Sequence, residues 1–327
     1  RRSSSQATAR SLILFVEIAY LSGLESRYDR RLPTRISREL TQPPSRNLVD
    51  YRKLLEEFQR LGRSKRVKVF RAGHSHEGRE ISYLAISDER NMERLAQLRN
   101  EIKESYPTVE FKSVNKFIVK GNASAFNDLP SVVMLHAATY GFEAAHTEAL
   151  LRVASVLAFT EEPSIREALS KLIVIVVPMM NPDGRQMALG EWSDTPLCFG
   201  SRGMGNAKGA ILNRDFTQMN EPETRAVHQI YNEWQPCAAY DPHEDMMFLG
   251  VHPEWPETCW CPPFGKPIHP NIADQTVSRI NELSNEIASR WRTAGFSYRS
   301  SVDSKEPLLT FLSSESFGVH FGLHGTP

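Results

Sequence analysis

Two residues of types that bind metal ions, Glu143 and His243, each follow an apolar segment of the chain. Glu143 comes after Val132–Leu135 and His243 after Cys237–Tyr240, and both runs have the composition of buried strands. The carboxyl ends of strands in an open α/β sheet form its ligand-binding edge, so we expect the two side chains to meet there. Carboxylate and imidazole are zinc ligands, and zinc turns water into a nucleophile at neutral pH. The pattern predicts a metal-assisted hydrolytic site; the plainer alternatives are a helix-start acid and a loop histidine.

Elements on both sides of these segments must position the two residues. The sequence predicts a mixed, largely parallel central sheet flanked by helices, an α/β/α architecture. The other predicted strands are Val67–Phe70, Ile81–Ile86, Lys112–Val119 and Ile173–Val177. The predicted helices are Leu48–Leu61, Asn91–Tyr106, Thr147–Phe159, Ile165–Leu172, Glu221–Trp234 and Asp274–Ala294. The glycine-containing stretch Gly184–Ile211 is predicted to be a long functional loop.

Four short motifs occur in a fixed order along this framework. They are Tyr140-Gly141-Phe142-Glu143, Asn181-Pro182-Asp183-Gly184, Asn213-Arg214-Asp215 and Asp241-Pro242-His243. In this order they resemble the zinc metallocarboxypeptidase family (carboxypeptidase A-like), and the turn Gly73–Arg79 matches that family's G-x-S-x-E-G-R turn. The resemblance runs from about Asn47 to the end of the chain and implies the family's α/β/α fold.

The resemblance implies one zinc ion held by Glu143 and His243. We expect Glu244 or Asp245, which follow His243 directly, to orient its imidazole ring. The family's first zinc-ligand histidine falls on Tyr140, and tyrosine is not a usual zinc ligand. Three candidates for the third ligand therefore stay open, beside the alternative that no tight zinc site forms. They are Tyr140 itself, His146 on the same helical face as Glu143, and His136, about 13 Å back along an extended strand.

The resemblance also implies residues that handle the substrate. Asn213 and Arg214 fall on the pair that grips the C-terminal carboxylate of a peptide, and Arg202 is the candidate for polarising the scissile carbonyl. A plainer alternative pairs Arg214 with Asp215 or Glu223 in a salt bridge. The general base falls either on Glu315 or beyond Pro327.

Three functions are compatible with these residues. The leading hypothesis is a zinc-dependent hydrolase of carboxypeptidase type that releases C-terminal residues from peptides. The second is a non-catalytic relative that binds a carboxylate-bearing ligand, which Tyr140 and the unplaced base favour. The third is an amidohydrolase acting on a small N-acyl amino acid.

Composition limits the remaining possibilities. Lys and Arg number 39, as do Asp and Glu, and this balance argues against a nucleic-acid partner. No run reaches the roughly 18 apolar residues of a membrane span, and four cysteines are too few for a disulfide scaffold. We expect residues 1–46 to be an N-terminal extension and linker, and 47–327 one carboxypeptidase-like domain, with its C-terminal end incomplete if the base lies beyond Pro327. The sequence does not decide the compartment.

Two histidines, His74 and His76, lie in the predicted turn between the first two strands. Their types suit a metal ion. Loop histidines spaced by two are more often solvated than ligating, and the turn is far in sequence from Glu143 and His243. We therefore interpret both as solvent-facing.

Overall fold

A computed structural model of the chain describes residues 48–105, 108–113, 116–120, 129–192, 203–243 and 272–293. Its helices are α3 (Tyr51–Leu61), α4 (Glu89–Glu93), α5 (Leu95–Ser105), α6 (Ala144–Phe159), α7 (Pro163–Lys171), α8 (Pro182–Trp192), α9 (Pro222–Trp234) and α10 (Asp274–Thr293), with a short 3-10 turn η3 (Leu212–Arg214). The strands are β1 (Val67–His74), β2 (Glu80–Ile86), β3 (Thr108–Ser113), β4 (Lys116–Lys120), β5 (Ser131–His136), β6 (Leu172–Val177) and β7 (Ala238–Tyr240).

Five of these strands form one mixed sheet in the order β1-β2-β6-β5-β7. β1 with β2 and β2 with β6 are antiparallel, whereas β5 is parallel to both β6 and β7. In the register, His136 at the end of β5 faces Val177, and Leu135 faces Tyr240. The three parallel strands therefore end at the same edge, and the residues that follow them are brought together there.

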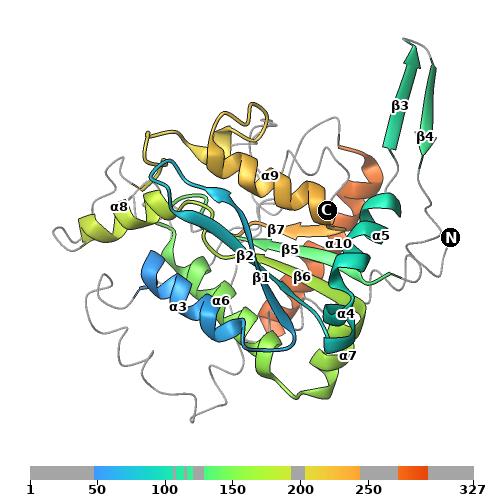
Figure 1. Cartoon of the computed structure of the whole chain (residues 1–327), viewed down its shortest axis with the longest axis horizontal. Coiled ribbons are helices and arrows are strands. Elements are labelled where there is room, and N and C mark those ends of the chain that lie inside the picture. The colour runs from blue at the N-terminus through green and yellow to red at the C-terminus, as the bar shows by residue number, and fades with distance from the viewer. Residues whose placement is uncertain are drawn as a thin grey trace.

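Helices cover both faces of this sheet, which confirms the predicted α/β/α layering (Figure 1). Neighbouring residues of β5 and β6 point to opposite faces, as the pleat of a strand requires. Val133, Leu135, Val174 and Val176 pack with α3, α6 and α7, while Val132, Met134, Ile173 and Ile175 pack with α5 and α9. Both faces are buried, which is why these strands are apolar at every position rather than at alternate ones.

Three predicted segments differ in the structure. The single helix expected over Asn91–Tyr106 is divided at Arg94 into α4 and α5. The strand expected over Lys112–Val119 is a hairpin, β3 paired with β4 in a separate two-stranded sheet. The loop expected from Gly184 begins instead as helix α8, because the Asn181 side chain accepts the Gly184 N–H at 2.9 Å and Pro182 occupies the first turn. The glycine content suggested a loop. Gly184 is instead a glycine because the chain packs closely there: an added Cβ would lie 2.6 Å from the carbonyl oxygen of Gly205.

None of the helices within the described part of the chain is long and apolar enough to cross a membrane.

Candidate active site

The turn that follows β5 is pinned to the segment that follows β6. The Ala137 N–H donates to Val177 O at 2.9 Å, and the Met180 N–H donates to Ala137 O at 3.0 Å. Ala138 has a φ of 56°, an uncommon conformation for a residue with a side chain. This backbone turns the chain sharply after β5 and sets the direction from which Glu143 approaches the sheet edge.

Glu143 occupies the N-cap position of α6 and is 2% exposed. Its carboxylate makes no capping hydrogen bond to the helix. Both carboxylate oxygens instead face the Nδ1 atom of His243, at 3.1 and 3.0 Å. Glu143 is therefore not an ordinary helix-start acid, because its carboxylate contacts His243, a residue 100 positions away in the sequence, and not the backbone of the helix.

His243 lies three residues beyond β7, and its side chain is 32% exposed. Its Nε2 atom lies 3.1 Å from Asp241 Oδ2, opposite the ring nitrogen that faces Glu143. The Asp241 and Glu143 carboxylates on either side raise the pKa of His243 well above its ordinary value, although burial opposes this. The two carboxylates therefore favour the protonated form of the His243 imidazole.

The sequence analysis assigned no role to Asp241, yet in the structure it connects two histidines. Its other oxygen, Oδ1, lies 3.0 Å from His136 Nδ1. Burial alone would raise the pKa of Asp241, but His243 and His136 hold it far below its ordinary value. The sequence signal that could have identified Asp241 as a partner of His243 is its position two residues before that histidine, directly after an apolar strand. Alternate residues of an extended chain point the same way.

The three candidates for a third metal ligand are placed differently. His136 is fully buried, and its nitrogens face Asp241 and the Met180 sulfur, so it is not directed at Glu143. The Tyr140 ring lies beside His243, with centroids 5.4 Å apart. His146 has a buried Nε2 atom with no hydrogen-bond partner, and burial lowers its pKa despite the nearby backbone of His243.

Of the residues predicted to act on the substrate, the structure describes Asn213 and Arg214. The Asn213 amide nitrogen lies 3.4 Å from His243 Nε2, which places it at the candidate site. Arg214 donates to the Asn213 carbonyl oxygen at 2.7 Å and belongs to the same 3-10 turn. Arg202 and Glu315 lie outside the described residues.

The other acids predicted near the site have distinct positions. Asp215 and Glu223, the proposed partners in the plainer reading of Arg214, accept backbone N–H groups from Glu221 and His76, respectively. Glu244 and Asp245, the predicted orienting acids for His243, lie outside the described residues. Asp241 occupies that orienting position in the structure.

The donor set fits a zinc ion at two of the three positions that a catalytic site needs. Glu143 and His243 present the right atom types toward each other, and the Tyr140 ring lies beside His243. His146 has a buried Nε2 atom without a partner, but it does not form a group of three donors with Glu143 and His243 within 4.8 Å of one another. Within the described ranges, the group of His, Cys, Asp and Glu donors that all lie within 4.8 Å of one another is elsewhere, at His76, Glu221 and Glu223.

Comparisons with known proteins point in one direction. The family model described as zinc carboxypeptidase matches residues 51–247. Human carboxypeptidase D is 33% identical over 84 residues, which are 25% of this chain and 6% of that protein. The rat protein of the same name is 27% identical over 123 residues, which are 37% of this chain and 9% of that protein. The chain thus matches only a small part of the length of these curated relatives.

Solved structures with the same fold are more distant in sequence. A metallo-carboxypeptidase from Burkholderia cenocepacia superposes with a TM-score of 0.52 at 15% identity, over 84% of this chain and 57% of that one. A structure from Burkholderia mallei, described as a carboxypeptidase, gives a TM-score of 0.55 at 16% identity, over 84% and 56%. At this identity the likeness establishes the fold.

Proposed function

Because the chain belongs to the zinc carboxypeptidase family, we propose that it is a zinc-dependent hydrolase that releases C-terminal residues from peptides. The observation that carries the proposal is the contact of 3.0 Å between Glu143 and His243 Nδ1. Glu143 follows β5 and His243 follows β7, and the two residues meet at the carboxyl edge of the sheet. Both are of types that hold a catalytic zinc ion.

Glu143 and His243 would hold the ion, with Tyr140 or His146 as the third ligand. A zinc ion bound there supplies a water molecule that is deprotonated near neutral pH and a positive charge for a developing oxyanion.

Asp241 prepares His243 for this role. Its carboxylate accepts the proton of Nε2, which leaves the lone pair of Nδ1 directed toward Glu143, where the ion would lie. Binding a metal ion then requires that Nδ1 lose the proton that it carries in the metal-free form. Asp241 is in turn held by His136, so the imidazole is fixed in orientation by a buried chain of hydrogen bonds.

Asn213 and Arg214 would bind the substrate carboxylate through an amide donor and a guanidinium group. Asn213 lies within 3.4 Å of His243, so a carboxylate bound there would place the adjoining peptide bond at the site. Arg202 would polarise the scissile carbonyl, and Glu315 or a residue beyond Pro327 would take the proton of the attacking water. These roles rest on the order of the family's motifs.

A second candidate function is carboxylate binding without cleavage. Tyr140 favours it, because that position carries the first histidine ligand in the family and the Tyr140 ring lies beside His243. With two ligands, zinc would bind weakly, and the Glu143–His243 ion pair would persist in its place. Asn213 and Arg214 would then still recognise a C-terminal carboxylate.

Zinc retention and peptide hydrolysis together test both candidates. We expect Glu143→Ala and His243→Ala each to retain about one zinc ion fewer than the wild type after dialysis, because each removes a direct ligand. Both should also lose hydrolysis of a peptide with a free C-terminus, while the amidated peptide is cleaved by neither variant nor wild type. Metal content is measured by atomic emission and cleavage by mass spectrometry.

Glu167→Ala is the matched control, because it removes an exposed glutamate that pairs with Lys171 on α7. It should keep the zinc content and activity of the wild type. If Glu143→Ala and His243→Ala also keep both, the proposed site is wrong. If the wild type binds the free-carboxylate peptide without cleaving it, the second function replaces the first.

A further inference from the structure

His76 belongs to the turn between β1 and β2, which is held rigidly by its neighbours. Ser75 Oγ donates to Asp183 Oδ1 at 2.7 Å, and the Glu77 N–H donates to Asp183 Oδ2 at 2.9 Å. Gly78, with a φ of 81°, allows the tight turn that its N–H closes by donating to Ser75 O. The position of His76 is therefore fixed by the backbone on both sides of it.

Glu221 and Glu223 lie on either side of Pro222 at the start of α9. Asp215 accepts the N–H of Glu221 at 2.9 Å, so a different residue holds the backbone of this helix start. Glu221 is the N-cap residue but makes no side-chain capping bond. Its carboxylate is directed toward His76 instead.

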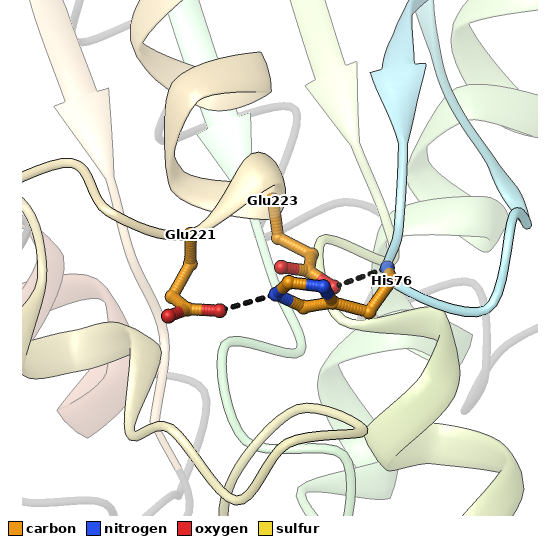
Figure 2. A group of neighbouring side chains, drawn as sticks. All are labelled: His76, Glu221 and Glu223. Atoms are coloured by element: carbon orange, nitrogen blue, oxygen red, sulfur yellow. Dashed lines mark hydrogen bonds and ion pairs between the residues drawn. The ribbon is translucent and has the colours of Figure 1, made fainter.

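The three side chains converge from two separate elements (Figure 2). His76 Nε2 lies 2.5 Å from Glu221 Oε2, and the His76 backbone N–H donates to Glu223 Oε1 at 3.1 Å. Asn206 donates its amide to both carboxylates, at 2.6 Å to Glu221 and 3.1 Å to Glu223. One donor atom from each of the three residues lies within 4.8 Å of the other two.

This arrangement concentrates negative charge in a poorly solvated place. Glu223 is fully buried, and the Glu221 side chain is 16% exposed. His76 and the Asn206 amide both lie within hydrogen-bond distance of the Glu221 carboxylate and stabilise its charge there. Two carboxylates with one imidazole leave a net charge that a dication would balance.

We propose that His76, Glu221 and Glu223 form a binding site for a divalent metal ion of the zinc class. The site shares no residue with the Glu143–His243 pair and does not depend on the proposed function. Zinc lies about 2.0–2.2 Å from imidazole nitrogen and carboxylate oxygen, so its ligands are at most about 4.4 Å apart. The observed spacing needs small side-chain shifts to match, and an imidazole ligand favours zinc over calcium.

An outer layer of hydrogen bonds already orients these ligands. Asn206 holds both carboxylates, and its own carbonyl oxygen accepts the N–H groups of Lys208 and Ala210 at 3.0 and 3.1 Å. Such outer partners fix the direction of metal ligands and raise metal affinity. Their presence distinguishes this group from a solvated cluster of acids.

A metal ion here would join three parts of the fold. It would link the β1–β2 turn to the start of α9 and, through Asn206, to the segment 203–210. The same segment reaches the candidate active site, because the Gly141 N–H donates to Gly203 O and the Asn181 amide donates to Gly205 O. The ion would therefore brace the backbone behind the Tyr140–Glu143 turn, as a structural metal does.

Zinc titration of the full-length chain tests this site with matched variants. We expect His76→Gln and Glu221→Gln each to bind about one zinc ion fewer than the wild type. His74→Gln, which changes an exposed histidine two residues away, should bind as many as the wild type. Zinc should also raise the melting temperature of the wild type and of His74→Gln more than that of His76→Gln.

Metal binding is the readout, so the result is separate from whether the protein cleaves peptides. Glu143→Ala is expected to lose a different zinc ion, and its loss should add to that of His76→Gln. The proposal is overturned if His76→Gln and Glu221→Gln bind as much zinc as His74→Gln. It is also overturned if calcium stabilises the wild type as strongly as zinc at equal concentration, since the imidazole would then have no role.

Discussion

His243 lies between two carboxylates, and each of them faces a different nitrogen of the imidazole ring. Asp241 fixes the Nε2 side, while Glu143 faces Nδ1, where either a proton or a metal ion can be held. The same three side chains are therefore compatible with a metal site and with an ion pair. The residue that decides between them is the third ligand.

Changing Tyr140 to histidine should tighten zinc binding. An imidazole binds zinc in its neutral form, and the Tyr140 ring already lies 5.4 Å from that of His243. An outer-layer partner typically contributes about 10–100-fold to metal affinity, so a direct ligand should give at least about tenfold. Competition with a chromogenic chelator measures the change.

Tyr140→Phe is the control, because it keeps the ring and removes the hydroxyl group. If the affinity of Tyr140→His is no higher than that of Tyr140→Phe, position 140 does not face the metal, and His146 becomes the stronger candidate.

At the residue scale, the sequence predicted which residues would meet but not how they are connected. Glu143 and His243 follow apolar strands, and strand ends converge in such sheets, so their contact was predictable. The role of Asp241 was not, because a hydrogen bond to His136 depends on the register of β5 against β7. The positions of Arg202 and Glu315 stay predictions.

Among the elements, the turn before α6 and the start of α8 are packed backbone to backbone. A Cβ added at Gly141 would lie 2.0 Å from the carbonyl carbon of Gly184 and 2.3 Å from the nitrogen of Arg185. Backbone atoms cannot move aside as the end of a flexible side chain can. The Glu143 turn is therefore positioned by direct contact with the N-P-D-G motif.

Gly141→Ala should lower the free energy of unfolding by about 3 kcal/mol, the upper part of the usual range for overpacking. Gly190→Ala is the matched control, because an added Cβ at this exposed position of α8 meets nothing within 4 Å. Alanine there should stabilise the helix by about 0.5–1 kcal/mol. Urea denaturation of both variants measures these changes; equal stabilities would show that the two motifs are not tightly packed.

Whether a segment is a helix or a strand was predictable where its apolar pattern was long. The prediction was ambiguous where glycine residues interrupted that pattern. The buried strands β5 and β6 and the helix α9 lie close to their predicted bounds, because apolar runs and a Pro-Glu helix start are strong signals. Helix α8 was predicted as a loop. Close packing of Gly184 against Gly205 explains that glycine, and this contact joins two different segments of the chain.

Across the whole molecule, contacts distant in sequence tie the first described residues to the helices behind the candidate site. Glu148 on α6 accepts the Val49 N–H at 2.6 Å, and Arg185 on α8 donates to the Val49 carbonyl oxygen at 3.1 Å. Burial raises the pKa of Glu148, and the Val49 N–H and Arg185 offset only part of this. The folded state therefore holds a proton on Glu148 more tightly than the unfolded chain does.

This shift predicts a pH dependence of stability. An acid whose pKa is raised on folding loses its contribution as the pH rises through the unfolded and then the folded value. Glu148→Gln keeps an oxygen that can accept the Val49 N–H but cannot ionise. The wild type should therefore lose stability relative to Glu148→Gln between pH 4 and pH 7, as measured by urea denaturation at both values. A difference that grows in favour of the wild type would mean that the Arg185 ion pair outweighs burial.

The mixed sheet and its two helical layers were predictable from apolar strands separated by helical patterns. The order of the strands was not, because β6 follows β5 in the chain yet lies between β5 and β2. Pairings between segments far apart in the chain are not encoded in local periodicity.

Anomalous X-ray diffraction at the zinc absorption edge, from crystals grown with zinc, tests the central claim most directly. The account predicts a zinc peak about 2.0–2.2 Å from a Glu143 carboxylate oxygen and from His243 Nδ1. Well-ordered Glu143 and His243 side chains in direct contact, with no zinc peak between them, would contradict it.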